Sequence, residues 1–301
     1  MLEAKQVTII GTGLLGASLA LALKAGGFAG RIVGVGRRVQ TLDQTRELGC
    51  FDHLTVSIAE ALEGASGGGA HMVVVAAPLG HFRDVFTKIA QNDDDSLIVT
   101  DVGSTKASVC ALAGELLPEP GRFVGSHPMA GSEQRGPTAA DAGLFEGKPC
   151  VVTAQADTDE RAIELVESMW RVVGMRLIEM EPAAHDRCVA LVSHLPHAVA
   201  AMLVKVAMAD GGVALGIAST GFADTTRIAA GDPEIWVDIF QTNRDAVIES
   251  VGRMIDELDR FKKVMVRGDS GALKRLLAGA EQVRKDWGCG REEQDRGLGD
   301  G

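Results

Sequence analysis

The feature that most constrains the fold is a glycine motif close to the start of the chain. An apolar strand pattern at Gln6–Ile10 leads into Gly11-Thr12-Gly13-Leu14-Leu15-Gly16, and a helix is predicted from there to Ala25. This spacing, between a strand and a helix, is typical of a dinucleotide-binding turn. Gly11 permits the tight turn, Gly13 lets the backbone approach a pyrophosphate, and Gly16 lets the helix pack closely on the strand. The amides at the helix start then face the phosphates. The alternative is a plain strand, turn and helix in which the glycines occur by chance.

The end of the second predicted strand indicates which dinucleotide binds. An NAD site usually has an acidic residue there, about 20 residues past the glycines, to bind the ribose diol. Here the strand Arg31–Val35 is followed by Gly36-Arg37-Arg38. Two guanidinium groups can pair with a 2′-phosphate, so we predict NADP rather than NAD. The alternative is that both arginines only solvate a surface loop. We also assign Ala77 and Pro78, which follow the third strand, to the cofactor site.

Composition limits the other classes of function. The chain has 301 residues and a net charge of −11, which argues against general binding to nucleic acid or anionic membranes. An anionic substrate must therefore be held by locally placed cations. No apolar run approaches the roughly 20 residues of a membrane span, and the N-terminus leads directly into the first strand, so we expect neither membrane span nor signal peptide. Five scattered cysteines predict reduced thiols and a cytoplasmic location.

Strand and helix patterns alternate over the first half of the chain, which predicts a doubly wound parallel sheet of the Rossmann type, an α/β fold. The predicted strands are Gln6–Ile10, Arg31–Val35, His71–Ala76, Leu97–Asp101, Arg122–Ser126, Pro149–Thr153 and Arg176–Glu179. The predicted helices are Leu14–Ala25, Thr41–Leu48, His81–Ala90, Thr105–Leu116 and Thr158–Val173. The glycine-rich stretch Gly64–Ala70 predicts a flexible loop before the third strand.

The composition changes at Glu181-Pro182, and helical periodicity dominates from there on. The helical segments are His185–Ala209, with a break or bend at Pro196, then Gly211–Ala218, Pro233–Arg267 and Gly271–Lys285. We therefore predict a nucleotide-binding domain at residues 1–180, an all-α domain at 181–288 and a frayed, flexible tail at 289–301.

Two candidate catalytic residues follow predicted strands, where the carboxyl ends of a parallel sheet form the usual ligand crevice. Ser104 lies after Leu97–Asp101, although it could merely cap the next helix. His127 ends the following strand, where an imidazole can exchange a proton near neutral pH beside the expected nicotinamide. A structural histidine is the alternative. A nicotinamide and a proton acceptor together indicate oxidation of an alcohol carbon.

The helical half adds further polar candidates. His194 and His197 could share a helix face and bind a metal, but no third ligand has suitable spacing and Pro196 disturbs the geometry, so we expect no metal site. Arg227 could bind a carboxylate through two hydrogen bonds, or form an ordinary surface salt bridge. The pair His185-Asp186 also stands out, without an assigned role.

Five motifs occur together and in order: Gly11–Ser18, Asp101–Lys106, His127–Glu133, Ser193–His197, and Gly221–Ala229 followed by Asp232-Pro233 and Trp236. With these motifs the chain resembles the prephenate/arogenate dehydrogenase family over about Gln6 to Lys285. The resemblance implies a nucleotide-binding domain followed by an all-helical domain that forms a homodimer. It also implies oxidation of prephenate, or of its amino analogue arogenate, with loss of carbon dioxide and hydride transfer to the nicotinamide, in tyrosine biosynthesis.

The resemblance also implies roles for individual residues. His127 would accept the proton of the ring hydroxyl, and Ser104 would hydrogen-bond both that imidazole and the hydroxyl. Arg227 would bind a substrate carboxylate. The other matched residues would lie near the substrate side chain or line and gate the pocket; these are His197, Ser193 and Glu133. Many relatives have an acidic residue where this chain has Gly36-Arg37-Arg38, which favours NADP here.

Two other functions remain open from the sequence. A related β-hydroxyacid or imine reductase usually depends on a lysine in its helical half, but Lys205 is the only lysine between Lys148 and Lys262 and no family motif surrounds it. A non-catalytic NADP sensor would leave His127 and Ser104 unexplained.

Overall fold

The structure is a computed structural model that describes residues 2–63, 70–92, 96–131, 134–209 and 211–297. The chain forms two compact units, residues 1–244 and 245–301. The first unit contains the whole β-sheet together with the helices up to α10. The second contains two long helices.

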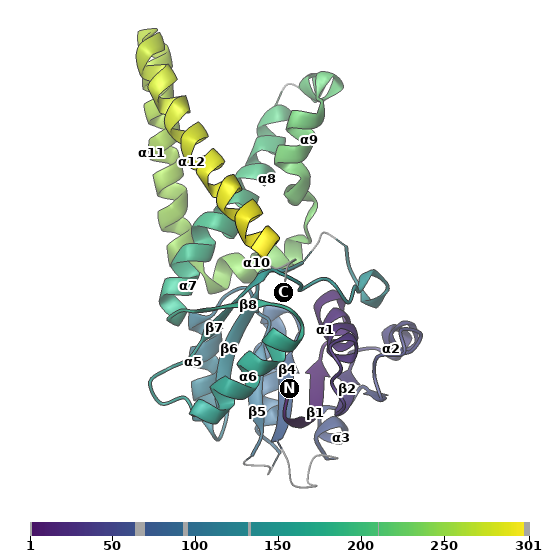
Figure 1. Ribbon diagram of the computed structural model, residues 1–301. Coiled ribbons are helices and arrows are strands. Elements are labelled where there is room, and N and C mark those ends of the chain that lie inside the picture. The colour runs from purple at the N-terminus through teal and green to yellow at the C-terminus, as the bar shows by residue number, and fades with distance from the viewer. Residues whose placement is uncertain (1, 64–69, 93–95, 132–133, 210, 298–301) are drawn as a thin grey trace. The chain divides into compact units, whose positions relative to one another are not determined.

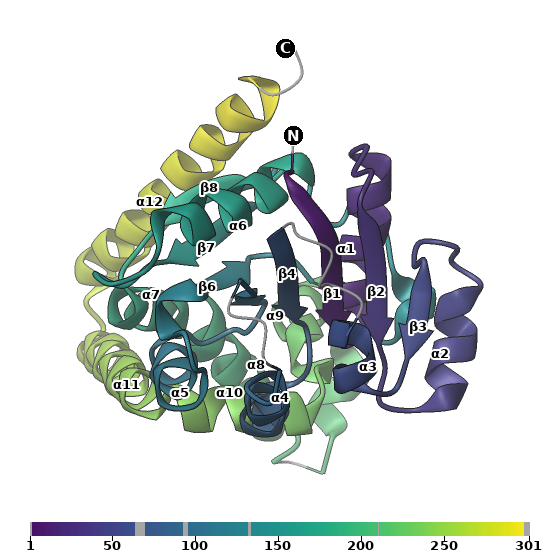
Figure 2. The same ribbon diagram turned by 90° about the horizontal axis from the view of Figure 1, so that it is seen from below.

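The core of the first unit is an eight-stranded sheet in the order β3-β2-β1-β4-β5-β6-β7-β8. Figure 1 shows the sheet, and β3 is labelled beside β2 in Figure 2. The strands are β1 (Ala4–Ile10), β2 (Arg31–Val35), β3 (His53–Thr55), β4 (Ala70–Val75), β5 (Ile98–Asp101), β6 (Phe123–Pro128), β7 (Pro149–Thr153) and β8 (Arg176–Glu179). The strand order reverses between β1 and β4. At such a switch point the connections leave in opposite directions and open a crevice beyond the carboxyl ends of the strands, which is where ligands bind.

Helices cover both faces of the sheet, which makes the strands apolar on both sides. On one face α1 (Leu14–Ala25) and α6 (Glu160–Val172) pack against alternate residues of the strands, around the fully buried Trp170. On the other face lie α3 (Ile58–Glu63), α4 (Phe82–Ile89) and α5 (Ala107–Leu116), as Figure 2 shows. The remaining helix of this half is α2 (Val39–Arg46).

The Rossmann-type sheet predicted from the sequence is confirmed, with two corrections. The predicted strands and helices of this half lie within about two residues of the observed bounds, but β3 was missed because three residues are too few to show a strand pattern. The sheet is also not wholly parallel, because β7 pairs antiparallel with β6. The described part of the connection between them contains only the short 3-10 turn η3 (Pro137–Ala139), and without a crossover helix the chain returns in the opposite direction. Of the glycine-rich loop predicted at Gly64–Ala70, residues 64–69 lie outside the described residues.

The following helices extend the first unit beyond the sheet. They are α7 (Pro182–Val189), α8 (Leu195–Ala207), α9 (Thr220–Thr226) and α10 (Pro233–Thr242), with short turns η5 (Val213–Ile217) and η6 (Arg227–Ala230). The break predicted at Pro196 takes the form of a π-helical turn, η4 (Ala190–His194), just before that proline. Since proline cannot donate to the carbonyl four residues earlier, a wider turn relieves the mismatch.

Two of the predicted helical segments differ from the observed ones. Gly211–Ala218 contains only a 3-10 turn, and Pro233–Arg267 divides at Asn243. Asn243 leaves the helical conformation, with φ −118° and ψ 33°, and its side chain bonds to α7 and η4.

The second unit contains α11 (Arg244–Arg267), which begins at the last residue of the first unit, and α12 (Ser270–Gly297). Gly268 joins them with φ 64°, a conformation that favours glycine. Large apolar side chains are exposed along both helices, among them Ile255, Leu258 and Val283. The helix α12 continues past Gly288, where the sequence predicts a frayed tail, and residues 298–301 lie outside the described residues.

Among the described residues, one continuous helical segment is long and apolar enough to cross a membrane: Pro182–Ala207, with 26 residues and a mean hydropathy of 1.6 in its most apolar window. This corrects the expectation that no segment approaches that length, because the π turn joins α7 and α8 end to end. A buried helix of an ordinary globular protein meets the same criterion. This segment carries the buried polar residues Asp186, His194 and His197.

The glycine turn yields a matched pair of variants. A Cβ on Gly16 would lie 1.9 Å from the Gly11 carbonyl oxygen, whereas a Cβ on Gly13 would have nothing within 4 Å. We expect Gly16→Ala to destabilise the fold by roughly 3 kcal/mol, since helix and strand must separate. Gly13→Ala should keep the wild-type thermal unfolding midpoint but weaken dinucleotide binding, because its methyl group occupies the approach to the backbone. Thermal unfolding and equilibrium binding measure the two effects; equal destabilisation by both variants would contradict this reading.

Candidate active site

A cleft of about 980 Å³ lies over the switch point of the sheet. Its floor is the glycine turn Gly11–Leu15, and the ends of β2 and β4 contribute Gly36–Arg38 and Ala76–Leu79. Gly11 has φ 113°, and a Cβ there would lie 2.4 Å from the Ala76 carbonyl oxygen, so the turn packs tightly on the neighbouring strand. No side chain caps the start of α1, which leaves its first amides to face the cleft. These residues fit a dinucleotide, with the pyrophosphate at the start of α1.

The structure brings the sequence-predicted cofactor residues together. All of them except Gly16 line the cleft: Gly11, Thr12, Gly13, Leu14, Leu15, Arg37, Arg38, Ala77 and Pro78. Gly16 lies behind the turn, in contact with the Gly11 carbonyl. Of the described lining residues Asp84 is the one acid, and Lys88 pairs with it at 2.8 Å. The cleft therefore carries a local excess of positive charge in an acidic protein.

Ser104 also lines the cleft, at the end of a loop held by a buried ion pair. The Lys106 ammonium contacts the Asp101 carboxylate, and both side chains are fully buried. That carboxylate also accepts the amides of Gly103 at 2.7 Å and Ser126 at 3.1 Å. The carboxyl ends of β5 and β6 are thereby tied together; Ser104 follows β5, and His127 is the last residue but one of β6.

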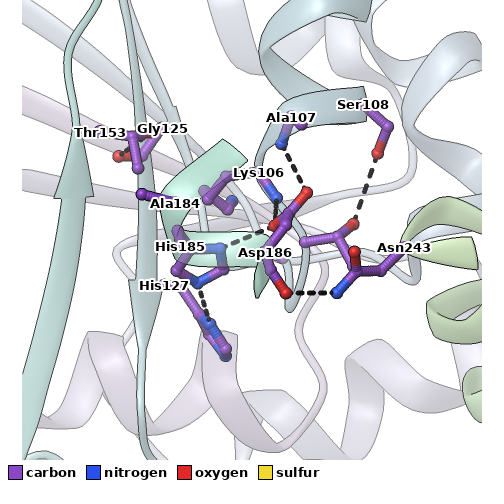
Figure 3. A network of polar contacts seen from close by, with 12 residues as sticks. Lys106, Ala107, Ser108, Gly125, His127, Thr153, Ala184, His185, Asp186 and Asn243 are labelled. Atoms are coloured by element: carbon purple, nitrogen blue, oxygen red, sulfur yellow. Dashed lines mark hydrogen bonds and ion pairs between the residues drawn. The ribbon is translucent and has the colours of Figure 1, made fainter. Parts of the chain in front are cut away.

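His127 is the first member of a chain of three hydrogen-bonded side chains (Figure 3). Its Nδ1 lies 2.8 Å from Nε2 of His185, and Nδ1 of His185 lies 2.8 Å from Oδ1 of Asp186. Asp186 also accepts the amides of Lys106 at 2.7 Å and Ala107 at 2.9 Å, where α5 begins. The chain thus runs from the first turn of α5, through α7, to the end of β6.

The chemistry of these atoms determines which nitrogens carry protons. An ionised carboxylate only accepts hydrogen bonds, so His185 donates to Asp186 from Nδ1, and in the neutral form of His185 its Nε2 is the acceptor. His127 must then donate from Nδ1, which leaves a lone pair on its Nε2. This is the arrangement that a general base requires, with a lone pair on the ring nitrogen that does not take part in the contact to His185.

The acid–base properties of the site agree with that assignment. Burial lowers the pKa of His127 well below its ordinary value, and the nearby His185, Lys106 and His194 lower it further, so His127 is neutral at pH 7. Burial opposes ionisation of Asp186, but the hydrogen bonds from His185 and from the two amides outweigh it and keep the pKa of this carboxyl below its usual value. A neutral base and an ionised carboxylate are thus maintained together.

A second cluster lies where α8 meets α10. The rings of His197 and Trp236 stack with centroids 3.5 Å apart, and Asn243 donates to Nδ1 of His194 at 3.1 Å. Nε2 of His194 and Nδ1 of His197 are buried and have no hydrogen-bond partner among the described residues. Burial lowers the pKa of His194 to about 4 and also lowers that of His197. Unpartnered buried polar atoms are costly, so a water molecule or a ligand group that reached either nitrogen would gain a hydrogen bond there.

The other predicted substrate residues are less closely connected to this centre. Arg227 is exposed at the start of η6, which packs against α8 and leads to Gly231 beside His197 and Trp236. Ser193 is half-buried in the π turn. Glu133 lies outside the described residues. Within the described part of the chain, no group of three His, Cys, Asp or Glu side chains could hold a metal ion.

Sequence reasoning missed the roles of three residues in the site, His185, Asp186 and Asn243. His185 and Asp186 were noticed as a pair, but the contact to His127, 58 residues away, has no local signal. Asn243 lies inside a stretch that reads as one long helix, yet its amide donates to the Asp186 carbonyl at 2.8 Å. A polar amide at a helix break was the one available hint.

The doubly wound sheet, the cleft at its switch point and the buried base define a nicotinamide-nucleotide-dependent dehydrogenase. Two family models match the chain: the prephenate dehydrogenase nucleotide-binding domain over residues 19–179 and the prephenate dehydrogenase dimerization domain over residues 181–279. The chain belongs to the prephenate dehydrogenase family.

Individual relatives agree with this assignment. A prephenate dehydrogenase of Bacillus subtilis is 32% identical over 92% of this chain and 75% of its own length. The structure of prephenate dehydrogenase from A. aeolicus, in complex with hydroxyphenyl propionate and NAD+, matches with a TM-score of 0.87 and 34% identity, over 95% of this chain and 99% of that one. Arogenate dehydrogenase of Synechocystis matches with a TM-score of 0.78 and 28% identity, over 94% of this chain and 99% of that one.

The lowered pKa of His127 predicts the pH dependence of the reaction. If His127 is the base, its neutral imidazole is the active form, and activity is lost as pH falls through the pKa of His127 in the folded enzyme. We expect kcat/KM to stay level from pH 7.5 down through about 6.5, the ordinary imidazole range, and to fall only in more acidic solution. Initial rates at constant ionic strength measure this. A midpoint at or above that range would contradict the assignment of His127 as a buried neutral base.

Proposed function

We propose that this enzyme oxidatively decarboxylates prephenate, arogenate or both, and reduces NADP+. The observation that carries the proposal is the hydrogen-bonded chain from Asp186 through His185 to His127, which ends in a buried neutral base. Its place at the end of β6, beside the strand that leads to Ser104, is the expected position of a nicotinamide ring.

The proposed reaction begins at the ring hydroxyl of the substrate. Nε2 of His127 takes the proton of this hydroxyl as a hydride leaves the carbon that bears it. A nicotinamide bound in the cleft would accept the hydride. The ring carboxylate then leaves as carbon dioxide, and its bonding electrons make the ring aromatic. The ring oxygen, now a phenolate, takes back a proton to give the phenol. The products are 4-hydroxyphenylpyruvate from prephenate and tyrosine from arogenate. His185 and Asp186 stabilise the positive charge that forms on His127, and Ser104 orients the hydroxyl.

Substrate recognition is assigned to the helical part of the chain. Arg227 pairs with a carboxylate, since a guanidinium binds two carboxylate oxygens at once. His197, held against Trp236, contacts the side chain of the substrate, for which its unpartnered Nδ1 provides a polar partner. Ser193 and Glu133 complete this assignment as residues that line or gate the pocket.

The choice of NADP rests on the charge at the end of β2. Arg37 and Arg38 line the cleft there, and Asp84, the one acid among its described lining residues, is paired with Lys88. A 2′-phosphate would find two guanidinium groups and no unpaired carboxylate. NAD, which lacks the 2′-phosphate, would leave both arginines without a partner anion.

We also propose that the enzyme is a homodimer located in the cytoplasm. Its substrate is then a small dianion, and the enzyme binds neither nucleic acid nor membranes. Exposed apolar side chains on α11 and α12, including Trp287, and the match to a dimerization domain support self-association. Free buried cysteines such as Cys50, Cys110 and Cys150 support a reducing compartment.

The reaction is tested by initial rates of reduced-nicotinamide formation with prephenate and with arogenate, each against NADP and NAD. We expect turnover with at least one substrate, fastest with NADP. His127→Asn should lower kcat by roughly two to four orders of magnitude with little change in cofactor affinity, because it removes the base and leaves the cleft intact.

The matched control is His53→Gln, which changes a partly exposed histidine that pairs with Glu60 and does not line the cleft. It should retain wild-type kcat. Full turnover by His127→Asn, or no turnover with any of the four pairs by protein that binds NADP, would refute the proposal.

The cofactor assignment has its own test. Arg37→Asp places a carboxylate where the ribose diol of NAD would lie and repels a 2′-phosphate. We expect the ratio of kcat/KM for NADP to that for NAD to fall by about tenfold or more, as expected when a charged hydrogen bond is replaced by repulsion. An unchanged ratio, measured with the same substrate, would rule out Arg37 as a phosphate ligand.

A further inference from the structure

His81 forms a contact across the rim of the cleft that the proposed function leaves unexplained. Its Nε2 lies 2.7 Å from Nη1 of Arg37, and both side chains line the cleft and are exposed to solvent. Arg37 follows β2, whereas His81 ends the turn η1 (Leu79–His81), which follows β4. The two residues therefore face each other from strands on opposite sides of β1.

The backbone that carries His81 is held at three points, so the position of its side chain is well defined. The His81 amide donates to the Pro78 carbonyl at 3.0 Å. The amide of Gly80 donates to the Asp238 carboxylate at 2.9 Å. On the other side, Phe82, the first residue of α4, is buried in the core. An exposed imidazole on such a support loses little further freedom when it binds a ligand.

The charges around His81 favour an anion. Arg37 and Arg38 approach from the end of β2, and Lys88 lines the same cleft from α4. Lys88 pairs with Asp84, so these two charges largely cancel, and Asp238 accepts the Gly80 amide. The two guanidinium groups are therefore the cations that favour an anion beside His81. Because Arg37 is always charged and only donates, the imidazole in this contact is neutral and accepts.

We propose that His81 completes the 2′-phosphate site formed by Arg37 and Arg38, and that it binds the phosphate as an imidazolium. The inference rests on the proposed choice of NADP. A phosphate between Arg37 and His81 takes the place of their mutual hydrogen bond and accepts from both. Imidazole is the side chain whose charge changes between pH 5 and 8, so preference for the phosphorylated cofactor should rise as pH falls.

The test uses equilibrium binding of 2′,5′-ADP and of 5′-AMP, which differ in the 2′-phosphate, to the full-length protein at pH 8.5 and 6.5 and constant ionic strength. The lower pH keeps most of the phosphate dianionic, since its second pKa is about 6. The variant His81→Gln can still accept from Arg37 but cannot become charged. His53→Gln, described above, is the matched control.

We expect His81→Gln to bind 2′,5′-ADP about as tightly as wild type at pH 8.5 and about fivefold more weakly at pH 6.5, the range expected for one exposed charge pair. Binding of 5′-AMP should not change. His81→Lys, a permanent cation, should bind 2′,5′-ADP more tightly than wild type at pH 8.5 and lose the His81-dependent pH effect.

Two results would overturn the inference, and they differ in what they leave standing. A loss in His81→Gln that is equal at both pH values would show that His81 only anchors Arg37, while the choice of NADP stands. If wild type does not prefer 2′,5′-ADP over 5′-AMP at either pH, the choice of NADP fails and this inference fails with it.

Discussion

The carboxylate of Asp186 is the group on which both the packing of the first unit and the chemistry of its site depend. It accepts hydrogen bonds from the amides at the start of α5 and from the imidazole of His185. The backbone carbonyl of Asp186 accepts a hydrogen bond from the side-chain amide of Asn243. A carboxylate buried to this extent is stable as a charge only because these donors surround it. The helices beyond the sheet are thus joined to it through the group that orients the proposed base. A shift of α7 against α5 would misalign His127 as well as loosen the packing.

Burial of polar groups separates proton transfer from ligand binding in this site. Along the chain from Asp186 to His127, and at the ion pair of Asp101 and Lys106, the buried groups satisfy one another, so their geometry is established before any ligand arrives. Near Trp236 the opposite holds, because buried nitrogens of His194 and His197 have no partner among the described residues. The first region is therefore preorganised for catalysis, and the second gains most from a polar ligand.

The cleft also illustrates how an acidic protein binds an anion. A net charge of −11 repels anions at long range, but salt screens that field over about 8 Å, so the groups lining the cleft dominate. There the start of α1, Arg37 and Arg38 are all favourable to phosphate, and the nearby acid is neutralised by Lys88. Local placement of a few cations therefore outweighs the overall charge of the chain.

The sequence alone determined the features that depend on local patterns: the alternating strands and helices, the glycine turn, and the placing of Ser104 and His127 at strand ends, which a parallel sheet gathers on one edge. It could not reveal contacts between distant segments. His127 and His185 are 58 residues apart in the chain, and Lys106 and Asp186 are 80 apart. Arg37 and His81 come into contact because the sheet places β2 and β4 on either side of β1. The direction of β7 and the helix break at Asn243 were likewise decided by connections and by long-range hydrogen bonds. Periodicity indicates which face of an element is buried, whereas only the packed structure decides which polar groups come into contact. These contacts determine the protonation and orientation of the proposed base.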